Sequence, residues 1–304
     1  MTNEESFRAG YVALVGRPNV GKSTLMNALL GQKVAAVSPR PQTTRQRQLG
    51  ILTTDEAQIV FMDTPGIHKP VHKLGEFMNQ VAEDTLKDAD LILWLVEANN
   101  NPTPEDTRIA DKLREMKDLP PLVLAVNKLD LTGGYDLSER LDKIQRLYPQ
   151  GKLMQFSAST GAGLDQLLAE ILKNLPEGEP FFDPDQVTDY YERDIAAELI
   201  REAALLNLRE EIPHGVAVRI DDFEEREDGS AYIHATLFVE RESHKGIVIG
   251  KGGEMMKKIG SSARKEIEDM SGRKAFLDLR VKVNQNWRNK PDALRWLGYV
   301  RDKE

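Results

Sequence analysis

The sequence predicts an α/β domain with a mainly parallel sheet flanked by helices, followed by a smaller α+β domain. Over residues 1–175, short apolar runs alternate with helix-like segments, which is typical of parallel strands connected by helices. Residues 176–188 are rich in proline and acidic side chains, and we interpret them as a linker. Residues 189–304 follow another order: a helical segment, two strand-like runs separated by an acidic turn at Asp221–Gly229, a glycine loop between two helices, and a last strand.

The composition indicates a globular protein without disulfides or membrane spans. Its 304 residues are enough for two hydrophobic cores. No apolar run approaches the ~18 residues that a membrane-spanning helix needs, and the acidic, polar N-terminus is not typical of a secretory signal. Cysteine is absent, which excludes thiolate metal sites and favours a cytoplasmic location.

The charge is distributed unevenly along the chain. The whole sequence carries −8, but residues 244–290 contain 12 Lys and Arg against 5 Asp and Glu, so this segment is at +7 and the remainder at −15. A uniformly acidic chain would repel nucleic acid. The basic segment instead predicts a nucleic-acid-binding face in the second domain.

The first apolar run, Tyr11–Val15, leads into Gly16-Arg-Pro-Asn-Val-Gly-Lys-Ser23, and a helix-like segment follows at Thr24–Leu30. Strand, glycine loop and helix form the context in which this G-x-x-x-x-G-K-S spacing binds phosphates. The N–H groups of the loop and the positive end of the helix attract phosphate oxygens. Lys22 can neutralise the β- and γ-phosphates, and the Ser23 hydroxyl can ligate Mg²⁺.

Polar motifs follow several of the later apolar runs, which are Gln58–Met62, Leu91–Val96, Leu122–Val126 and Leu153–Phe156. Asp63-Thr-Pro-Gly66 follows the first of these runs. Its aspartate can hold Mg²⁺ through water, and the Gly66 N–H can face a γ-phosphate. Because ligands of parallel sheets bind outside the carboxyl ends of the strands, we expect these motifs to meet at one edge of the sheet.

The tetrapeptide Asn127-Lys-Leu-Asp130 predicts a guanine site. The Asp130 carboxylate can accept hydrogen bonds from the ring N1–H and the exocyclic amine of guanine, a donor pair that adenine lacks. Asn127 can bond the other side of the base, and the Lys128 stem can pack along it. Ser157-Ala-Ser159, after the last run, is expected to complete the pocket with backbone N–H groups. An ATPase is therefore disfavoured.

The connection between the first helix and the second apolar run contains Pro41-Gln-Thr-Thr-Arg45. A threonine hydroxyl in this segment can complete the Mg²⁺ shell when a γ-phosphate is present. We select Thr44 for this role, with Thr43 as the alternative. Arg40, Arg45 and Arg47 lie in or near the segment and receive no role.

The order of these motifs is that of small GTPase domains, and the whole chain resembles the Era family of bacterial GTPases. The family resemblance rests on Pro41–Arg45, on the linker with its Asp185-Gln-Val-Thr-Asp189 end, and on His244-Lys-Gly-Ile-Val-Ile-Gly-Lys-Gly-Gly253. It implies a P-loop GTPase domain followed by a type II KH domain. In the last motif, Gly250 and Gly253 let two helices meet at a tight turn, against which an RNA backbone can lie.

The resemblance also implies a function. It is that of a Mg²⁺-dependent GTPase with a slow intrinsic rate that binds the 3′ region of 16S ribosomal RNA and acts in small-subunit assembly. K⁺ near Asn19 is implied as a stimulator of hydrolysis. The implied catalytic residues are Lys22, Thr44 and Gly66, and the implied metal ligands are Ser23, Thr44 and, through water, Asp63.

The expected nucleotide contacts are Gly16, Arg17, Pro18, Asn19, Val20, Gly21, Lys22, Ser23, Thr24, Asp63, Thr64, Pro65, Gly66, Asn127, Lys128, Asp130, Ser157, Ala158 and Ser159. The expected RNA contacts are Ile249, Gly250, Lys251, Gly252, Gly253, Lys257, Lys258, Arg264, Arg280 and Lys282, with further positive charge from Arg273 and Lys274.

The residue that orients the attacking water is not evident from the sequence. Ras-like GTPases carry a glutamine directly after D-x-x-G, and this chain has Ile67 there. His68 and His72 lie nearby, and we expect them to be incidental surface-loop histidines.

The end of the chain leaves an alternative open for the second domain. Four large side chains cluster there: Trp287, Trp296, Leu297 and Tyr299. We expect them to cap the core of the second domain. The alternative is an amphipathic tail that docks a protein or the inner face of the cell membrane rather than RNA.

Overall fold

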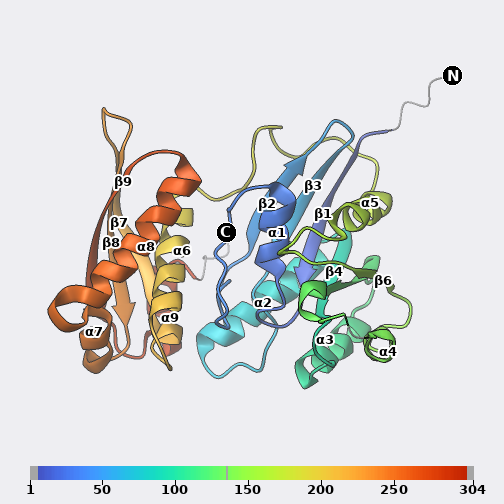
Figure 1. Cartoon of the computed structure of the whole chain (residues 1–304), viewed down its shortest axis with the longest axis horizontal. Helices are drawn as coiled ribbons and strands as arrows, with labels where there is room; N and C mark the ends of the chain where they lie inside the picture. Colours follow the sequence, from blue (N-terminus) through green and yellow to red (C-terminus); the bar gives the residue numbers. More distant parts are fainter. Residues whose placement is uncertain (1–5, 135, 300–304) are drawn as a thin grey trace. The chain divides into compact units, whose positions relative to one another are not determined.

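The computed structural model describes residues 6–134 and 136–299, which form two compact units (Figure 1). Of these described residues, the first unit comprises 6–33 together with 44–69 and 78–189. The second comprises 190–299 and two short segments of the N-terminal half, 34–43 and 70–77. Each unit has a hydrophobic core of its own.

A six-stranded sheet with the order β2-β3-β1-β4-β5-β6 forms the centre of the first unit. Its strands are β1 (Arg8–Val15), β2 (Gln48–Thr53), β3 (Ala57–Asp63), β4 (Leu91–Glu97), β5 (Leu122–Asn127) and β6 (Lys152–Gln155). Neighbouring strands pair in parallel, except that β2 is antiparallel to β3. The predicted mainly parallel sheet is confirmed, and the motifs that follow β1, β3 and β5 share one edge of it.

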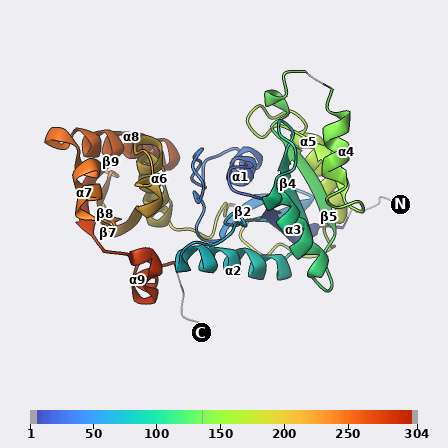
Figure 2. The same ribbon diagram turned by 90° about the horizontal axis from the view of Figure 1, so that it is seen from below.

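Helices cover both faces of this sheet (Figure 2). They are α1 (Lys22–Leu30), α2 (Lys73–Lys87), α3 (Pro104–Glu115), α4 (Ser138–Gln145) and α5 (Leu164–Asn174). Leu86 of α2, Ile109 of α3 and Ile144 of α4 share a core cluster with Trp94 of β4. The opposite face is covered by α1 and α5. All seven residues of β4 are buried, because strands between two helical layers meet no solvent on either face.

The strand β2 is not among the strands predicted from the sequence. This edge strand contains Gly50, which weakens the apolar pattern of a strand. The structure explains the glycine, since a Cβ at Gly50 would lie 2.7 Å from the side chain of Met26 in α1. The predicted linker lies along β2, where the N–H of Ile51 donates to the carbonyl of Val187 at 2.9 Å. The domain limits inferred from the sequence stay a prediction.

The second unit has the order α-β-β-α-α-β that the sequence predicts. Its elements are α6 (Glu192–Asn207), β7 (Ala217–Glu225), β8 (Ala231–Val239), α7 (Glu242–Ile249), α8 (Glu254–Ser271), β9 (Ala275–Val283) and α9 (Pro291–Trp296). The sheet order is β7-β8-β9, with β8 and β9 parallel. Leu199 of α6, Ile233 of β8 and Ile259 of α8 meet in the core.

One boundary in the second unit differs from the sequence interpretation. Asp221–Gly229 was interpreted as an acidic turn, but β7 continues through Glu225. The pairing of β7 with β8 shifts register between Ile220 and Asp222, as at a β-bulge. A bulge breaks the strict alternation of a strand, so the acidic residues beyond it give no strand-like pattern in the sequence.

The aromatic residues near the C-terminus cap the second unit, as expected. Trp287 is fully buried, its Nε1 donates to the carbonyl of Gly215 at 2.9 Å, and its ring stacks on Tyr299 with 5.6 Å between centroids. Trp296 is half exposed and meets Phe238 edge to face at 5.0 Å. Among residues 6–134 and 136–299, no helix has the length and apolar character required to span a bilayer.

Candidate functional site

The phosphate loop joins β1 to α1 and is fixed by close packing. Gly21 has a left-handed backbone (φ 103), and a Cβ there would lie 2.3 Å from Nδ2 of Asn127. Lys22 is buried, with Nζ 3.3 Å from the carbonyl oxygens of Gly16 and Arg17. Burial lowers the pKa of Lys22 to about 8, although the Asp63 carboxylate opposes this shift. Phosphate oxygens at the same place would favour the charged amine.

Two hydroxyls and one carboxylate converge at the start of α1. Ser23 Oγ donates to Asp63 Oδ2 at 2.6 Å and lies 3.0 Å from Thr44 Oγ1, which is 3.1 Å from the same carboxylate oxygen. The Thr43 hydroxyl instead donates to the carbonyl of Arg40 at 2.7 Å. The geometry therefore brings Thr44, and not Thr43, to the other two groups.

The chemistry of this cluster fits a magnesium ion. Mg²⁺ usually takes one or two carboxylates and completes its shell with water and phosphate oxygens. Burial raises the pKa of Asp63, opposed by the Lys22 charge, and Oδ1 of Asp63 has no hydrogen-bond partner of standard geometry among the described residues. A water molecule bound to the metal could donate a hydrogen bond to this oxygen. The described residues contain no group of three or more His, Asp or Glu side chains placed to hold a metal.

Asn127 connects three of the predicted motifs. It is almost fully buried, and its Nδ2 donates to the carbonyl of Val20 at 2.9 Å. Its Oδ1 accepts hydrogen bonds from the N–H groups of Lys128 at 2.7 Å and Ala158 at 2.9 Å. The side chain thus joins the phosphate loop, the base motif and the Ser157–Ser159 loop.

The carboxylate of Asp130 is held beside this junction. Ser157 Oγ donates to Asp130 Oδ1 at 2.6 Å and lies 3.1 Å from Ser159 Oγ. The hydrogen bond from Ser157 lowers the pKa of Asp130, which is exposed. A charged, accessible carboxylate is therefore presented at the edge of the sheet, as a guanine-reading group requires.

The loop after β3 packs directly on the phosphate loop. A Cβ at Gly66 would lie 2.6 Å from the backbone nitrogen of Pro18. The Thr64 hydroxyl donates to the carbonyl of Leu14 at 2.8 Å, so it supports the main chain of β1. Ile67 is 2 % exposed and belongs to the core cluster under α2 and α3. The side chain at the usual glutamine position is therefore turned inward.

The remaining candidates near this loop have structural contacts. His68 Nδ1 lies 2.8 Å from the Gly66 carbonyl. The Asn79 side chain of α2 accepts from the His68 N–H at 3.3 Å and donates to its carbonyl at 2.8 Å. Arg45 is buried, and Arg47 forms an exposed ion pair. No role for these side chains in hydrolysis follows from the geometry.

The glycine loop of the second unit joins α7 to α8. Gly250 ends α7 with φ 74, and a Cβ there would lie 2.8 Å from the backbone nitrogen of Met255. Gly253 precedes α8 with φ 83 and has open space around its Cβ position. Lys251 and Gly252 are exposed between them, and Ile249 is 36 % exposed. The main chain of this turn is accessible to a ligand.

A groove of about 460 Å³ runs between α8 and β9. Lys257 and Arg264 of α8 line it together with Phe276 of β9 and Tyr232, its neighbour in the β8–β9 register. The Arg226 guanidinium lies 4.7 Å from the Tyr232 ring and 5.1 Å from the Phe276 ring. Positive charge beside accessible aromatic rings suits single-stranded nucleic acid, whose bases stack while its phosphates seek cations.

Not every predicted RNA contact lies in this groove. Arg280 and Lys282 are exposed on β9, and they alternate along the strand so that they share a face with Phe276. Lys258 is exposed on α8 but does not line the groove. Arg273 forms ion pairs with Glu192 and Glu225. The predicted cations that line the groove are therefore Lys257 and Arg264, while Lys258, Arg280 and Lys282 are exposed but do not line it.

Comparisons with known proteins agree over the whole chain. The model of the 50S ribosome-binding GTPase family matches residues 11–128, and that of the KH domain matches 211–288. The chain is 49% identical to GTPase Era of Ruminiclostridium cellulolyticum over 98% of this chain and 99% of that protein. GTPase Era of Caldanaerobacter subterraneus is also 49% identical, over 98% and 100%. The chain belongs to the Era family of GTPases.

Two solved Era structures resemble the whole chain, each with a TM-score of 0.92, 41% identity, and coverage of 97% of this chain and 100% of the other. One is a complex with MgGDPNP and nucleotides 1506–1542 of 16S ribosomal RNA. The other is an Aquifex aeolicus Era variant bound to GDP·AlF4⁻. As a member of the Era family, the chain is a GTP-hydrolysing enzyme with a GTPase domain and a KH domain.

Sequence reasoning on this Era-family chain missed the aromatic and apolar part of the groove. Tyr232, Met256 and Phe276 line it, but the predicted RNA contacts were basic residues, glycines and Ile249, which is not part of the lining. A period-two pattern in 276–282 was present, with Phe276, Asp278, Arg280 and Lys282 on one face of the strand. An aromatic ring on the otherwise polar face of this strand is the feature of the sequence that could have identified Phe276 as a candidate RNA contact.

Proposed function

We propose that this Era-family GTPase binds GTP and GDP at the edge of the first sheet, with the residues expected from the sequence. The phosphates lie in the loop 16–24, the base lies between the Asn127–Asp130 and Ser157–Ser159 motifs, and Gly66 offers its N–H to the γ-phosphate. The convergence of Ser23, Thr44 and Asp63 supports this placement. Mg²⁺ bound by these groups neutralises charge on the β- and γ-phosphates.

We further propose that the second unit binds the 3′ region of 16S ribosomal RNA and that the protein acts in small-subunit assembly. The observation that carries this proposal is the joint presence of an accessible glycine loop and a basic, aromatic-lined groove. A solved Era complex contains that RNA segment. The description of the matching GTPase family names the 50S ribosome, but that match covers only residues 11–128 and leaves out the KH domain.

The residues present predict slow intrinsic hydrolysis. Lys22 and the loop N–H groups can stabilise the negative charge of the phosphoryl group in the transition state. The position where related GTPases carry a water-orienting glutamine is occupied by the inward-facing Ile67. We propose that K⁺ near Asn19 adds positive charge in the transition state. Hydrolysis in K⁺ buffer should then exceed hydrolysis in Na⁺ buffer of equal ionic strength, and equal rates would contradict the proposal.

Binding of RNA tests the function of the second unit. A labelled single-stranded RNA from the 3′ end of 16S ribosomal RNA is titrated with the protein, with a non-hydrolysable GTP analogue or GDP, at a fixed salt concentration. We expect tighter binding with the analogue, and loss of binding when Gly250 and Gly253 are both replaced by Asp. Absence of binding in both nucleotide states would favour the docking alternative.

A cytoplasmic location follows from the proposed ribosomal partner. The sequence leaves open, as an alternative, peripheral attachment to the inner face of the cell membrane through the aromatic end of the chain. Trp287, Leu297 and Tyr299 are buried in the second unit, which removes most of the apolar surface that such attachment needs. Flotation with liposomes tests this alternative, and we expect the protein to stay in the unbound fraction.

A further inference from the structure

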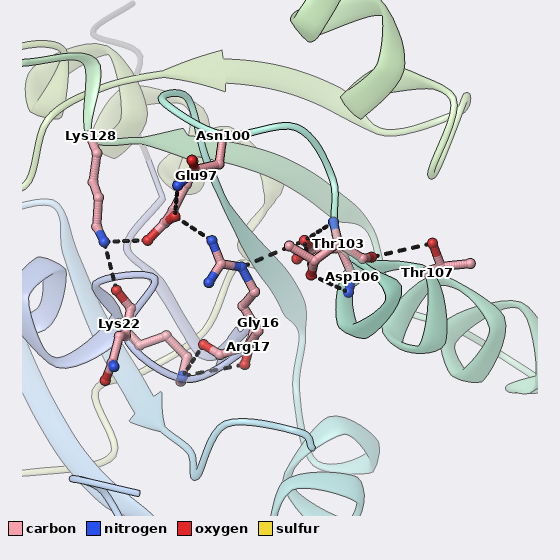
Figure 3. A network of polar contacts seen from close by, with 10 residues as sticks. Gly16, Arg17, Lys22, Glu97, Asn100, Thr103, Asp106, Thr107 and Lys128 are labelled. Atoms are coloured by element: carbon pink, nitrogen blue, oxygen red, sulfur yellow. Dashed lines mark hydrogen bonds and ion pairs between the residues drawn. The ribbon is translucent and has the colours of Figure 1, made fainter. Parts of the chain in front are cut away.

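A buried carboxylate connects the two halves of the nucleotide site. Glu97 is the last residue of β4 and is 5 % exposed. Its carboxylate forms ion pairs with Arg17 of the phosphate loop and Lys128 of the base motif, and accepts a hydrogen bond from Asn100 Nδ2 at 2.8 Å. Figure 3 shows Glu97 between the Arg17 and Lys128 side chains. One acid thus neutralises a cation from each motif.

The Arg17 side chain is fixed on both sides. Besides its pair with Glu97, its Nε lies 3.6 Å from Asp106 Oδ2. Asp106 is held by the start of α3, where the N–H and hydroxyl of Thr103 both donate to it at 2.8 Å. The carbonyl of Arg17 is one of the two oxygens beside Lys22 Nζ (Figure 3). The position of Arg17 therefore influences the loop that surrounds the phosphates.

The Lys128 side chain ties the base motif to the same loop. Its Nζ donates to the carbonyl of Asn19 at 2.8 Å in addition to pairing with Glu97. Lys128 and Asn19 both have left-handed backbones, with φ 68 and 64. Asparagine tolerates this conformation, but a lysine keeps it only where its surroundings hold it. Glu97 fixes the ammonium group that connects the strained Lys128 to Asn19.

We propose that Glu97 is a positioning residue that couples the phosphate loop to the base motif and holds both in the conformation that binds guanine nucleotide. A site held in its binding conformation loses less entropy on association and releases its ligand more slowly. Without the Glu97 charge, Arg17 and Lys128 lose their shared partner, and both loops gain freedom. The inference rests on the proposed placement of the nucleotide.

The first experiment measures dissociation of a fluorescent GDP from the full chain and from the Glu97→Gln variant. We expect dissociation to become about tenfold faster, the size of a typical coupling between contacting residues. Glu170→Gln is the matched control, because Glu170 is also buried and pairs with Lys152 and Lys173, but lies on α5 away from both motifs. Thermal unfolding of both variants measures the loss of stability alone.

Glu97→Asp covers the case in which Glu97→Gln does not fold. It keeps the charge but shortens the reach, so we expect dissociation to be faster than in the unmodified protein. The inference would be overturned if the folded Glu97 variant released GDP at the rate of the unmodified protein. It would also be overturned if its dissociation rate changed only as much as that of Glu170→Gln. If the unmodified protein binds no GDP, the proposed nucleotide site fails instead.

A double-mutant comparison separates coupling from a general loss of packing. Arg17→Met and Lys128→Met together remove both cations that Glu97 contacts. In this background, we expect Glu97→Gln to change the GDP dissociation rate by less than about twofold, because its partners are already absent. A full tenfold effect there would show that Glu97 acts through other contacts and would overturn the proposal.

Discussion

At the scale of single residues, we expect Asp130 to determine which base the proposed site accepts. The carboxylate accepts a hydrogen bond from Ser157, which moves its pKa further below neutral pH. Asp130→Asn replaces one acceptor oxygen by a donor, which complements the additional carbonyl of xanthine instead of the guanine amine. We expect GTP affinity to fall by at least about a hundredfold and XTP affinity to rise. Competition binding with the two nucleotides measures this, and unchanged GTP affinity would contradict the assignment.

The two neighbouring threonines should differ in their effect on nucleotide preference. Thr44 Oγ1 lies near Ser23 and Asp63, whereas the Thr43 hydroxyl is occupied by the carbonyl of Arg40. We expect Thr44→Ala to weaken binding of a GTP analogue by about tenfold and to leave GDP binding nearly unchanged.

Thr43→Ala serves as the matched control for Thr44→Ala. It should lower stability by about 1 kcal/mol without changing the ratio of the two affinities. Isothermal titration with both nucleotides distinguishes the variants. The reverse result would assign the role to Thr43.

The motif residues of the site could be predicted from the sequence because each motif has fixed spacing and follows a recognisable strand. Their supporting partners could not. Glu97 is a single acidic residue at the end of an apolar run, and its partners Arg17 and Lys128 lie 80 and 31 positions away. Asn79, which binds the main chain of His68, is an ordinary polar residue of a helix. Such contacts depend on how strands and helices pack, which no local pattern encodes.

At the scale of elements, the turn between α7 and α8 depends unequally on its two outer glycines. Both have positive φ, but only Gly250 lacks space for a Cβ. We expect Gly250→Ala to displace the start of α8 and to weaken RNA binding by about tenfold or more.

Gly253→Ala is the control for this turn. It should cost only the backbone strain, about 1 kcal/mol, with a smaller change in RNA affinity. Thermal unfolding and RNA titration of the two variants measure the difference. Equal effects on RNA affinity would show that Gly250 packing is unimportant for the interface.

The elements that the sequence predicts best are those whose burial is uniform. β4 and β5 are buried on both faces, so their apolar runs mark them clearly. β2 was missed because it is an edge strand interrupted by Gly50, whose small size serves the packing of α1. The outer half of β7 was missed because its acidic residues, beyond the register shift, are exposed. Strands with one solvated face and an irregular pairing leave a weak signal in the sequence.

At the scale of the whole molecule, the chain passes from the second unit to the first between Thr43 and Thr44. Residues 34–43 belong to that unit, and the carbonyls of Gln42 and Thr43 accept hydrogen bonds from Arg201 of α6. Arg201 is 1 % exposed and also pairs with Glu198. The next residue, Thr44, belongs to the first unit and approaches Ser23 and Asp63. If bound nucleotide orders Thr44, as proposed, the peptide that Arg201 holds is the one directly before it in the chain.

This connection predicts that Arg201 transmits the nucleotide state to RNA binding. Arg201→Met keeps the length of the side chain but removes both hydrogen bonds to the segment. We expect the ratio of the RNA affinity with a GTP analogue to the RNA affinity with GDP to fall toward one. The affinity for GDP itself should change by less than about threefold, because the variant affects how the two nucleotide states differ and not how nucleotide is held.

Arg288→Met is the matched control, since Arg288 pairs with Glu240 inside the second unit, just as Arg201 pairs with Glu198. Both variants should lose stability, because each leaves a carboxylate without its partner. Only Arg201→Met should change the affinity ratio. If the ratio stays at the value of the unmodified protein, the nucleotide state reaches the RNA interface by a route other than the peptide before Thr44.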